Sequence, residues 1–244
     1  MTYRTSDGVT ISAWYVPSSN RAAVILLHGS GSTRSAVLDH AVALARHGYG
    51  VLLADARGHG RSGGRAMDFG WYGNQDIGTA VSYLLTRPDV DGNRIAAVGL
   101  SMGGEEAVGA AGGDPRIRAV VGEGVTNRTY ADKGWLDETY GLRGWLQQRV
   151  EWVLYATTDL LTAADPPVAL RDAVARAAPR PVLLIAAGDV ADEAIAARWI
   201  QSGSPTTVAV WVVPGAGHTG GLHVQPQEWE TRVTSFLDQA LIIG

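Results

Sequence analysis

The stretch Arg94–Ala111, RIAAVGLSMGGEEAVGAA, places a serine between glycines where a short apolar run ends and an Ala-rich segment begins. Gly99 to Gly103 match G-x-S-x-G, the pattern of a sharp turn between a strand and a helix. Such a turn strains the backbone of its serine, and side chains two positions before or after it would collide with neighbouring backbone. The stretch therefore predicts a strand, a hydroxyl standing free at Ser101, and a helix over residues 101–112.

Similar apolar runs recur along the chain and alternate with segments of helical pattern. Residues 8–17 have alternating apolar positions and are interpreted as an edge hairpin strand. The continuous runs, each interpreted as a strand, span residues 21–28, 48–55, 93–100, 117–125, 180–188 and 206–215. The helical segments span residues 35–47, 74–85, 101–112, 192–201 and 226–240. Strands that are apolar throughout are typical of parallel sheets covered on both faces. The sequence therefore predicts an α/β fold with a doubly wound, mostly parallel sheet.

One stretch interrupts this alternation. Residues 126–179 contain no strand-like run but are rich in aromatic side chains, namely Tyr130, Trp135, Tyr140, Trp145, Trp152 and Tyr155. A segment of this length is not expected to be structureless inside a compact domain. We therefore predict a core of residues 1–125 and 180–244, and a mostly helical cap insertion of residues 126–179 over the carboxyl edge of the sheet. Alternatively, the aromatic side chains simply fill a small helical subdomain.

The composition disfavours several classes of partner. The 244 residues carry 24 acidic and 20 basic side chains without a basic run, so neither nucleic acid nor a membrane is expected as a partner. The chain has no cysteine, which excludes a thiolate nucleophile and Cys-based metal sites. The first residues show no secretion-signal pattern, so a cytoplasmic location is expected. The sequence gives no indication of the oligomeric state.

A serine hydroxyl is a weak nucleophile unless a base accepts its proton and a third group orients that base. Of the 6 histidines, His218 is the best candidate for the base, because it lies in a Gly-rich loop just after the last apolar run. His40 and His47 fall on the polar face of a predicted helix and are interpreted as solvated surface. His59, in a turn, and His223, shortly after His218, are interpreted as structural residues.

The orienting acid is expected between the serine and the histidine in the chain, after the strand PVLLIAAG at residues 181–188. The loop that follows has the sequence DVADE. Asp192 is the preferred acid, and Asp189, which directly follows the strand, is the first alternative. Glu193 and Glu123 remain as further candidates.

Attack on a carbonyl group develops negative charge on its oxygen, which backbone amides can stabilise. The amide of Met102, directly after the serine, is the first expected donor of this oxyanion hole. The second is expected near Gly29 and Ser30, in the loop LLHGSGSTR after an earlier strand.

The same loop resembles a dinucleotide-binding motif, because Gly29-Ser30-Gly31 follows one strand and Asp55 ends the next. That motif requires a small residue at position 34, where this chain has Arg34. We therefore expect no nucleotide cofactor. We also expect no metal, since no carboxylate is spaced to complete a site with His218 and His223.

Five motifs, in order and spacing, resemble the α/β-hydrolase superfamily and its serine esterases: LLHGSGS, LADARGHGRSGG, GLSMGG, PVLLIAAG and PGAGH. They run from about residue 20 to the C-terminus. The resemblance implies hydrolysis through an acyl-serine intermediate, in which Ser101 attacks, His218 moves the proton and an acid near Asp192 holds the imidazole. The superfamily pattern has an Asp three residues after the strand-ending glycine, where this chain has Ala191. Residues 57–60 match a structural turn of the superfamily.

The sequence thus predicts a serine hydrolase of carboxylesterase type that needs no cofactor and acts on a small-molecule ester. The aromatic side chains of residues 126–179 favour a small to medium apolar acyl or aryl group. A peptidase, thioesterase or acyltransferase would use the same residues. A ligand-binding protein without activity, on the same fold, is the alternative from a different class.

Overall fold

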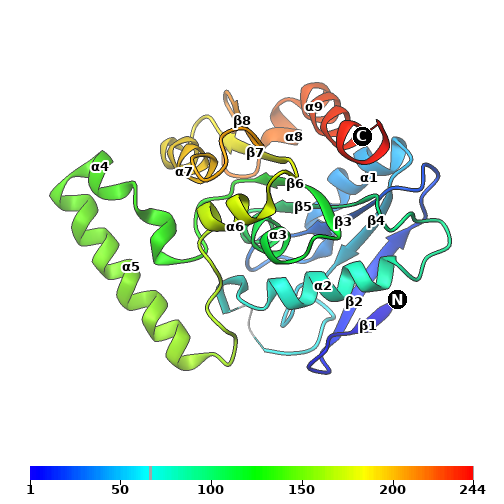
Figure 1. Cartoon of the computed structure of the whole chain (residues 1–244), viewed down its shortest axis with the longest axis horizontal. Helices are drawn as coiled ribbons and strands as arrows, with labels where there is room; N and C mark the ends of the chain where they lie inside the picture. The colour runs from blue at the N-terminus through cyan, green and yellow to red at the C-terminus, as the bar shows by residue number, and fades with distance from the viewer. Residues whose placement is uncertain (66–67, 244) are drawn as a thin grey trace.

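In the computed structural model, which describes residues 1–65 and 68–243, strands β1 to β8 form one sheet in the order β1-β2-β4-β3-β5-β6-β7-β8 (Figure 1). The strands are Thr2–Arg4 (β1), Thr10–Val16 (β2), Ala23–Leu27 (β3), Gly50–Ala54 (β4), Ile95–Leu100 (β5), Ile117–Glu123 (β6), Val182–Ala187 (β7) and Val208–Val213 (β8). β2 pairs antiparallel with both of its neighbours, β1 and β4. From β4 to β8 in this order, all neighbouring strands are parallel. The predicted doubly wound, mostly parallel sheet is confirmed. β1 was not predicted.

Helices cover both faces of this sheet (Figure 1). They are Leu38–Arg46 (α1), Gly73–Leu84 (α2), Met102–Gly113 (α3), Leu136–Tyr140 (α4), Leu142–Leu161 (α5), Leu170–Ala177 (α6), Ala191–Gln201 (α7), Gly221–Val224 (α8) and Pro226–Asp238 (α9). Short 3-10 turns span Arg34–Val37 (η1), Asp68–Gly70 (η2) and Tyr130–Lys133 (η3), and a π-helical turn spans Gln239–Ile243 (η4). None of the described helices is both long and apolar enough to cross a membrane.

The central strands are apolar throughout because each of their faces meets a helical layer. In β3, Ile25 and Leu27 pack in the cluster that includes α2, α3 and α6, whereas Val24 and Leu26 pack in the cluster that includes α1 and α9. Successive residues of a strand point to opposite faces, so burial on both sides requires an unbroken apolar run.

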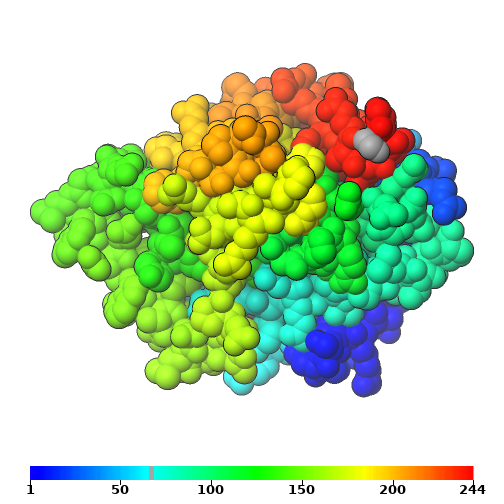
Figure 2. All heavy atoms as spheres, in the orientation of Figure 1, coloured from blue at the N-terminus to red at the C-terminus, as the bar shows by residue number. Residues whose placement is uncertain are grey.

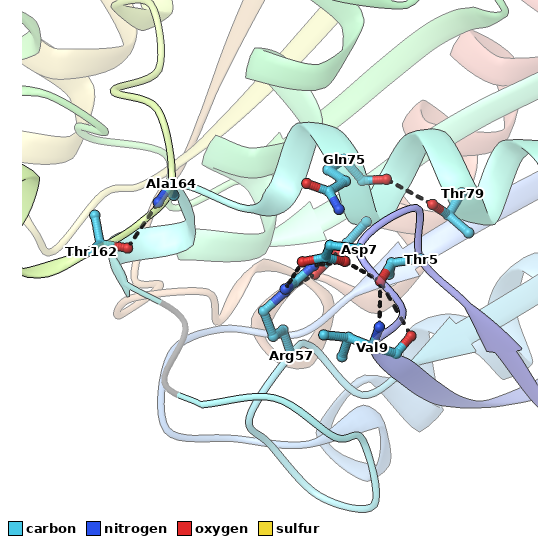
Figure 3. A network of polar contacts seen from close by, with 9 residues as sticks. Thr5, Asp7, Val9, Arg57, Gln75, Thr79, Thr162 and Ala164 are labelled. Atoms are coloured by element: carbon cyan, nitrogen blue, oxygen red, sulfur yellow. Dashed lines mark hydrogen bonds and ion pairs between the residues drawn. The ribbon is translucent and has the colours of Figure 1, made fainter.

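A buried arginine links the loop between β1 and β2 to the body of the protein. Arg57, in the turn after β4, lies against Asp7 in the loop between β1 and β2 (2.5 Å) and against Asp76 on α2 (2.6 Å). Figure 3 shows the side chains of Arg57 and Asp7 pointing toward one another, with Thr5 and Val9 closing the same loop. Arg57 is thus a structural residue, in agreement with its interpretation from the sequence.

Residues 126–179 are helical and contain no strand, as predicted. However, α6 packs on α3, with Ala173 against Gly112, and it belongs to the layer that covers the sheet. Only α4 and α5 project, at the left end of the molecule in Figures 1 and 2. The division into a core and a cap stays a prediction.

The aromatic side chains of this stretch do not share one interior. Trp135 and Tyr155 are buried, whereas Trp145 and Trp152 are 43% and 51% exposed. On α5, the side chains turned toward the body are mainly polar, and the apolar ones largely face solvent. The aromatic content of residues 126–179 is therefore only partly available to line a pocket.

Candidate active site

Ser101 lies in the strained turn that joins β5 to α3. Its backbone has φ 52° and ψ −125°, in a region that residues other than glycine rarely adopt. A β-carbon at Gly99 would lie 2.3 Å from the backbone of Gly103, and one at Gly103 would lie 2.6 Å from the carbonyl oxygen of His28. The expected strain is confirmed, and glycine stands on both sides of the serine because backbone occupies the space of a side chain.

Backbone hydrogen bonds fix this turn in place. The amide of Ser101 donates to the carbonyl of Glu123 at the end of β6 (2.7 Å), and its carbonyl accepts from the amide of Gly104 (2.8 Å). The side chain of Ser101 takes part in neither of these hydrogen bonds. Its hydroxyl is therefore free to interact with the loop that follows β8.

His218 in that loop reaches the hydroxyl. Its Nε2 lies 2.9 Å from Oγ of Ser101. The imidazole packs over Gly124, where a β-carbon would come within 2.8 Å of Cε1, and the next residue, Thr219, has a φ of 55°. Close packing on one side and a left-handed residue on the other hold the ring toward the serine.

The second ring nitrogen of His218 contacts a buried glutamate. Oε1 of Glu193 lies 2.5 Å from Nδ1, and Oε2 accepts a hydrogen bond from the amide of Ala187 (2.8 Å). Glu193 is 2% exposed and sits in the first turn of α7, where the helix dipole favours a carboxylate. The structure thus brings Ser101, His218 and Glu193 into one hydrogen-bonded chain.

The structure does not bring the two preferred acids to His218, and this corrects the sequence interpretation. The carboxylate of Asp192 accepts from the hydroxyl of Tyr140 (2.5 Å), and Asp189 is exposed at the end of β7. Glu123 is occupied elsewhere, by the amide of Gly221 (2.7 Å) and Nε1 of Trp229 (2.9 Å). Glu193, the further candidate in the same loop, takes the position instead.

The pKa of His218 responds to this neighbour. The hydrogen bond to Glu193 raises the pKa of the imidazole above its ordinary value, although partial burial works in the opposite direction. In the neutral form, Nδ1–H donates to Glu193 and leaves Nε2 free to accept the proton of Ser101. The arrangement has the polarity that a general base requires.

The expected amide donors also surround Ser101. Met102 is the first residue of α3, so its N–H has no acceptor within the helix. Gly29 approaches closely, since a β-carbon there would lie 3.2 Å from Cβ of Ser101. This close approach places the loop after β3 directly beside the serine.

His28, which the sequence interpretation did not single out, orients that loop. Its Nε2 accepts from the amide of Ala56 (2.9 Å), so Nδ1 carries the proton and donates to the carbonyl of Gly29 (2.8 Å). The C=O and N–H of a trans peptide point in opposite directions, so the N–H of Ser30 points away from His28. In the sequence, the only indication of this role of His28 is that it directly precedes Gly29.

The remaining histidines divide into two groups. His47 is exposed and pairs with Glu230 (2.9 Å), as expected of a solvated residue, and His59 bonds within its own turn. His40 was expected on the surface but is only 1% exposed, because α9 covers that side of α1. His223 is exposed near the site.

Comparison with known proteins shows which proteins this fold resembles. The family described as "Serine aminopeptidase, S33" matches residues 18–125, which contain the loop of Ser30 and the turn of Ser101. An esterase of Pyrococcus furiosus shares the fold with a TM-score of 0.75 and 25% identity, over 99% of this chain and 90% of that one. The chain belongs to the α/β-hydrolase superfamily.

Two further relatives of this α/β-hydrolase differ in what they share with it. An α/β-hydrolase of a Penicillium species superposes with a TM-score of 0.75 over 99% of this chain and 98% of that one, and its 20% identity shows the fold alone. An uncharacterised protein of Mycobacterium tuberculosis is 38% identical over 110 residues, or 44% of this chain. That match spans 38% of the relative's own length.

The site of this α/β-hydrolase contains no metal-binding cluster in the part of the chain that the structure describes. Residues 1–65 and 68–243 hold no group of three or more His, Asp or Glu side chains arranged to bind an ion.

Proposed function

We propose that this α/β-hydrolase is a serine esterase that cleaves carboxylic esters through an acyl-serine intermediate. The observation that carries the proposal is the unbroken chain from Oγ of Ser101 through His218 to Oε1 of Glu193, at 2.9 and 2.5 Å. A nucleophile, a base and an orienting acid at hydrogen-bond distance make up the arrangement that activates a serine.

In the first half of the reaction, Oγ of Ser101 attacks the ester carbonyl carbon while Nε2 of His218 accepts the hydroxyl proton. His218 then returns this proton to the alcohol oxygen as its bond to the acyl carbon breaks. In the second half, His218 takes a proton from water, the resulting hydroxide attacks the acyl carbon, and the proton passes to Oγ as the carboxylic acid leaves.

The oxyanion of both halves is bound by the amides of Ser30 and Met102. The orientation of the Gly29 carbonyl toward His28 supports the first assignment, and the position of Met102 at the N-terminus of α3 supports the second. Both are backbone groups, so they need no reorganisation during the reaction.

The acyl side of the substrate is apolar. A β-carbon at Gly70 would lie 3.1 Å from Cγ of Met102, which places η2 beside the nucleophile. Next to it, the rings of Phe69 and Trp71 lie 5.5 and 6.5 Å from that of Tyr155. This aromatic cluster supports a small to medium apolar acyl or aryl group.

The test is covalent labelling with a fluorophosphonate probe, together with hydrolysis of p-nitrophenyl butanoate. We expect the parent protein to be labelled at Ser101 and His218→Ala to lose the labelling. Ser101→Ala is expected to lower kcat by about a millionfold. Ser235→Ala, an exposed serine on α9, is the matched control and retains full activity. A folded parent protein without labelling would favour the non-catalytic binding protein.

A further inference from the structure

A pocket of about 440 Å³ opens to solvent beside Ser101 and His218. One wall is the loop after β3, with the hydroxyls of Ser30 and Ser32, and another is the loop after β8, with Thr219. Among the residues that the structure describes, no Asp, Glu, Lys or Arg lines this pocket. Its lining thus offers hydrogen bonds without a formal charge.

This pocket lies on the side where the alcohol leaves. The alcohol oxygen takes its proton from Nε2 of His218, so the alcohol must extend along the loop that carries His218. Thr219 and His223 of that loop line the pocket. The aromatic cluster of Phe69, Trp71 and Tyr155 is absent from its lining.

His40 also lines this pocket, and its imidazole is unsatisfied. The side chain is 1% exposed, yet neither Nδ1 nor Nε2 has a hydrogen-bond partner among the described residues. Oε2 of Glu123 lies 4.0 Å from Nε2, beyond hydrogen-bond distance, and both oxygens of Glu123 already accept other bonds. A buried polar group without a partner costs free energy, and a ligand hydroxyl in this pocket would supply the partner that His40 lacks.

Two aromatic rings pack against this imidazole, and it is neutral. It packs edge-on against Trp229, with ring centroids 5.1 Å apart, and against His223 at 6.4 Å. Burial and the neighbouring His223 lower the pKa of His40 to about 4. A neutral imidazole presents one donor and one acceptor, which complements a hydroxyl group better than a cation or an anion.

We infer that this pocket is a subsite for an uncharged, hydroxylated alcohol group, and that His40 hydrogen-bonds to a hydroxyl of that group. His40 then determines specificity for esters whose alcohol carries a second hydroxyl. The inference rests on the proposed esterase function, because the alcohol side is defined by the proton transfer from His218.

The test compares isosteric substrates that differ only in a terminal hydroxyl. The pairs are 2-hydroxyethyl and propyl butanoate, and 4-hydroxybutyl and pentyl butanoate, with kcat/KM measured by titration of the released acid. In the parent enzyme, at least one hydroxylated ester is expected to exceed its alkyl partner about tenfold, the size of one good hydrogen bond.

His40→Leu is expected to reduce this ratio to about one, and His40→Gln, which keeps a donor and an acceptor, to restore part of it. His47→Leu, at the exposed C-terminal end of the same helix, is the matched control and keeps the parent ratio. If His40 has only a structural role, His40→Leu would lower kcat/KM equally for both substrates of a pair and leave their ratio unchanged.

Two results would overturn the inference. One is a parent enzyme that hydrolyses both members of each pair equally, a measurement that does not depend on any variant folding. The other is a His40→Leu enzyme that retains the parent ratio. Failure of the esterase function itself is a separate result, seen as absent labelling of Ser101 and no hydrolysis of p-nitrophenyl butanoate, and it would remove both proposals together.

Discussion

Oε1 of Glu193 lies 2.5 Å from Nδ1 of His218, and the carboxylate reaches it from the first turn of a helix. The second oxygen of Glu193 is held by the amide of Ala187, at the end of β7. The acid is therefore anchored to the sheet although it belongs to α7. This anchoring lets one carboxylate both orient the imidazole and stabilise its protonated form.

Glu193→Gln is expected to lower kcat/KM for p-nitrophenyl butanoate about a thousandfold or more, because the neutral amide cannot stabilise the imidazolium. The matched control is Asp192→Asn on the adjacent residue, whose carboxylate contacts Tyr140 instead. We expect that variant to keep nearly full activity. Similar losses in the two variants would contradict the assignment of Glu193.

The pH dependence of kcat/KM is expected to follow His218. Activity requires the neutral base, so it falls as the pH drops through the pKa of His218, which the hydrogen bond to Glu193 raises. Glu193→Gln should therefore move the acid limb of the profile to lower pH. The maximal kcat/KM of this variant is expected to be lower than that of the parent. An acid limb at the same pH in both proteins would show that a different group controls it.

Gly99→Ala is expected to destabilise the protein by about 3 kcal/mol or more, because its β-carbon would meet the backbone of Gly103 and Gly104 at 2.3 to 2.5 Å. Gly113→Ala is the matched control at the other end of α3, where a β-carbon meets nothing within 4 Å. Denaturant unfolding of both variants measures the difference. Equal stability of the two would refute the close-packing explanation of the glycine before Ser101.

A buried carboxyl on the same helix predicts how stability depends on pH. Burial raises the pKa of Glu106 to about 8, from an ordinary value of 4.5. Between pH 4.5 and about pH 8, Glu106 keeps its proton in the folded chain but has lost it in the unfolded chain. The contribution of Glu106 to the free energy of unfolding therefore falls as the pH rises through this range. Glu106→Gln should therefore gain stability relative to the parent on going from pH 5 to pH 8.

Thermal unfolding of both proteins at the two pH values tests this expectation. The exposed Glu138→Gln is the control and should show the same offset from the parent at pH 5 and pH 8. An offset for Glu106→Gln that does not change with pH would show that its carboxyl is ionised in the folded protein throughout.

The sheet was predictable from the sequence because burial on both faces leaves a local signal. Each central strand, such as β3 with Ala23–Leu27, is an unbroken apolar run. The strand Thr2–Arg4 was missed because it has three residues and no apolar pattern. Its pairing depends on β2 and not on its own composition.

At the site, Ser101 and His218 follow strand ends and lie within hydrogen-bond distance of one another, whereas the preferred acid, Asp192, does not reach the histidine. A pattern that counts residues from the end of β7 assumes an aspartate in the loop. In this chain α7 begins at Ala191, and the longer side chain of Glu193 reaches back from its first turn. The start of α7 and the length of the Glu193 side chain together determine which carboxylate reaches His218. Neither can be inferred from the spacing of the motifs.

His40 shows a second kind of error. The sequence interpretation assigned it to the polar face of α1, yet Ala43 and Leu44, three and four positions later on the same face of that helix, are buried like His40. Its burial arises from Trp229 on α9, about 190 positions later in the sequence. The identity of such a distant partner is not visible in local periodicity.

The order of the strands in the chain also has a consequence for how the protein is made. The turn of Ser101 and both amide donors belong to the first half of the sequence, whereas Glu193 and His218 follow β7 and β8, and β8 lies at the edge of the sheet. Synthesis proceeds from the N-terminus, so Ser101 leaves the ribosome well before Glu193 and His218. The hydrogen-bonded chain of these three residues can therefore form only after β8 has left the ribosome and joined the sheet. Until then the hydroxyl of Ser101 has no histidine partner.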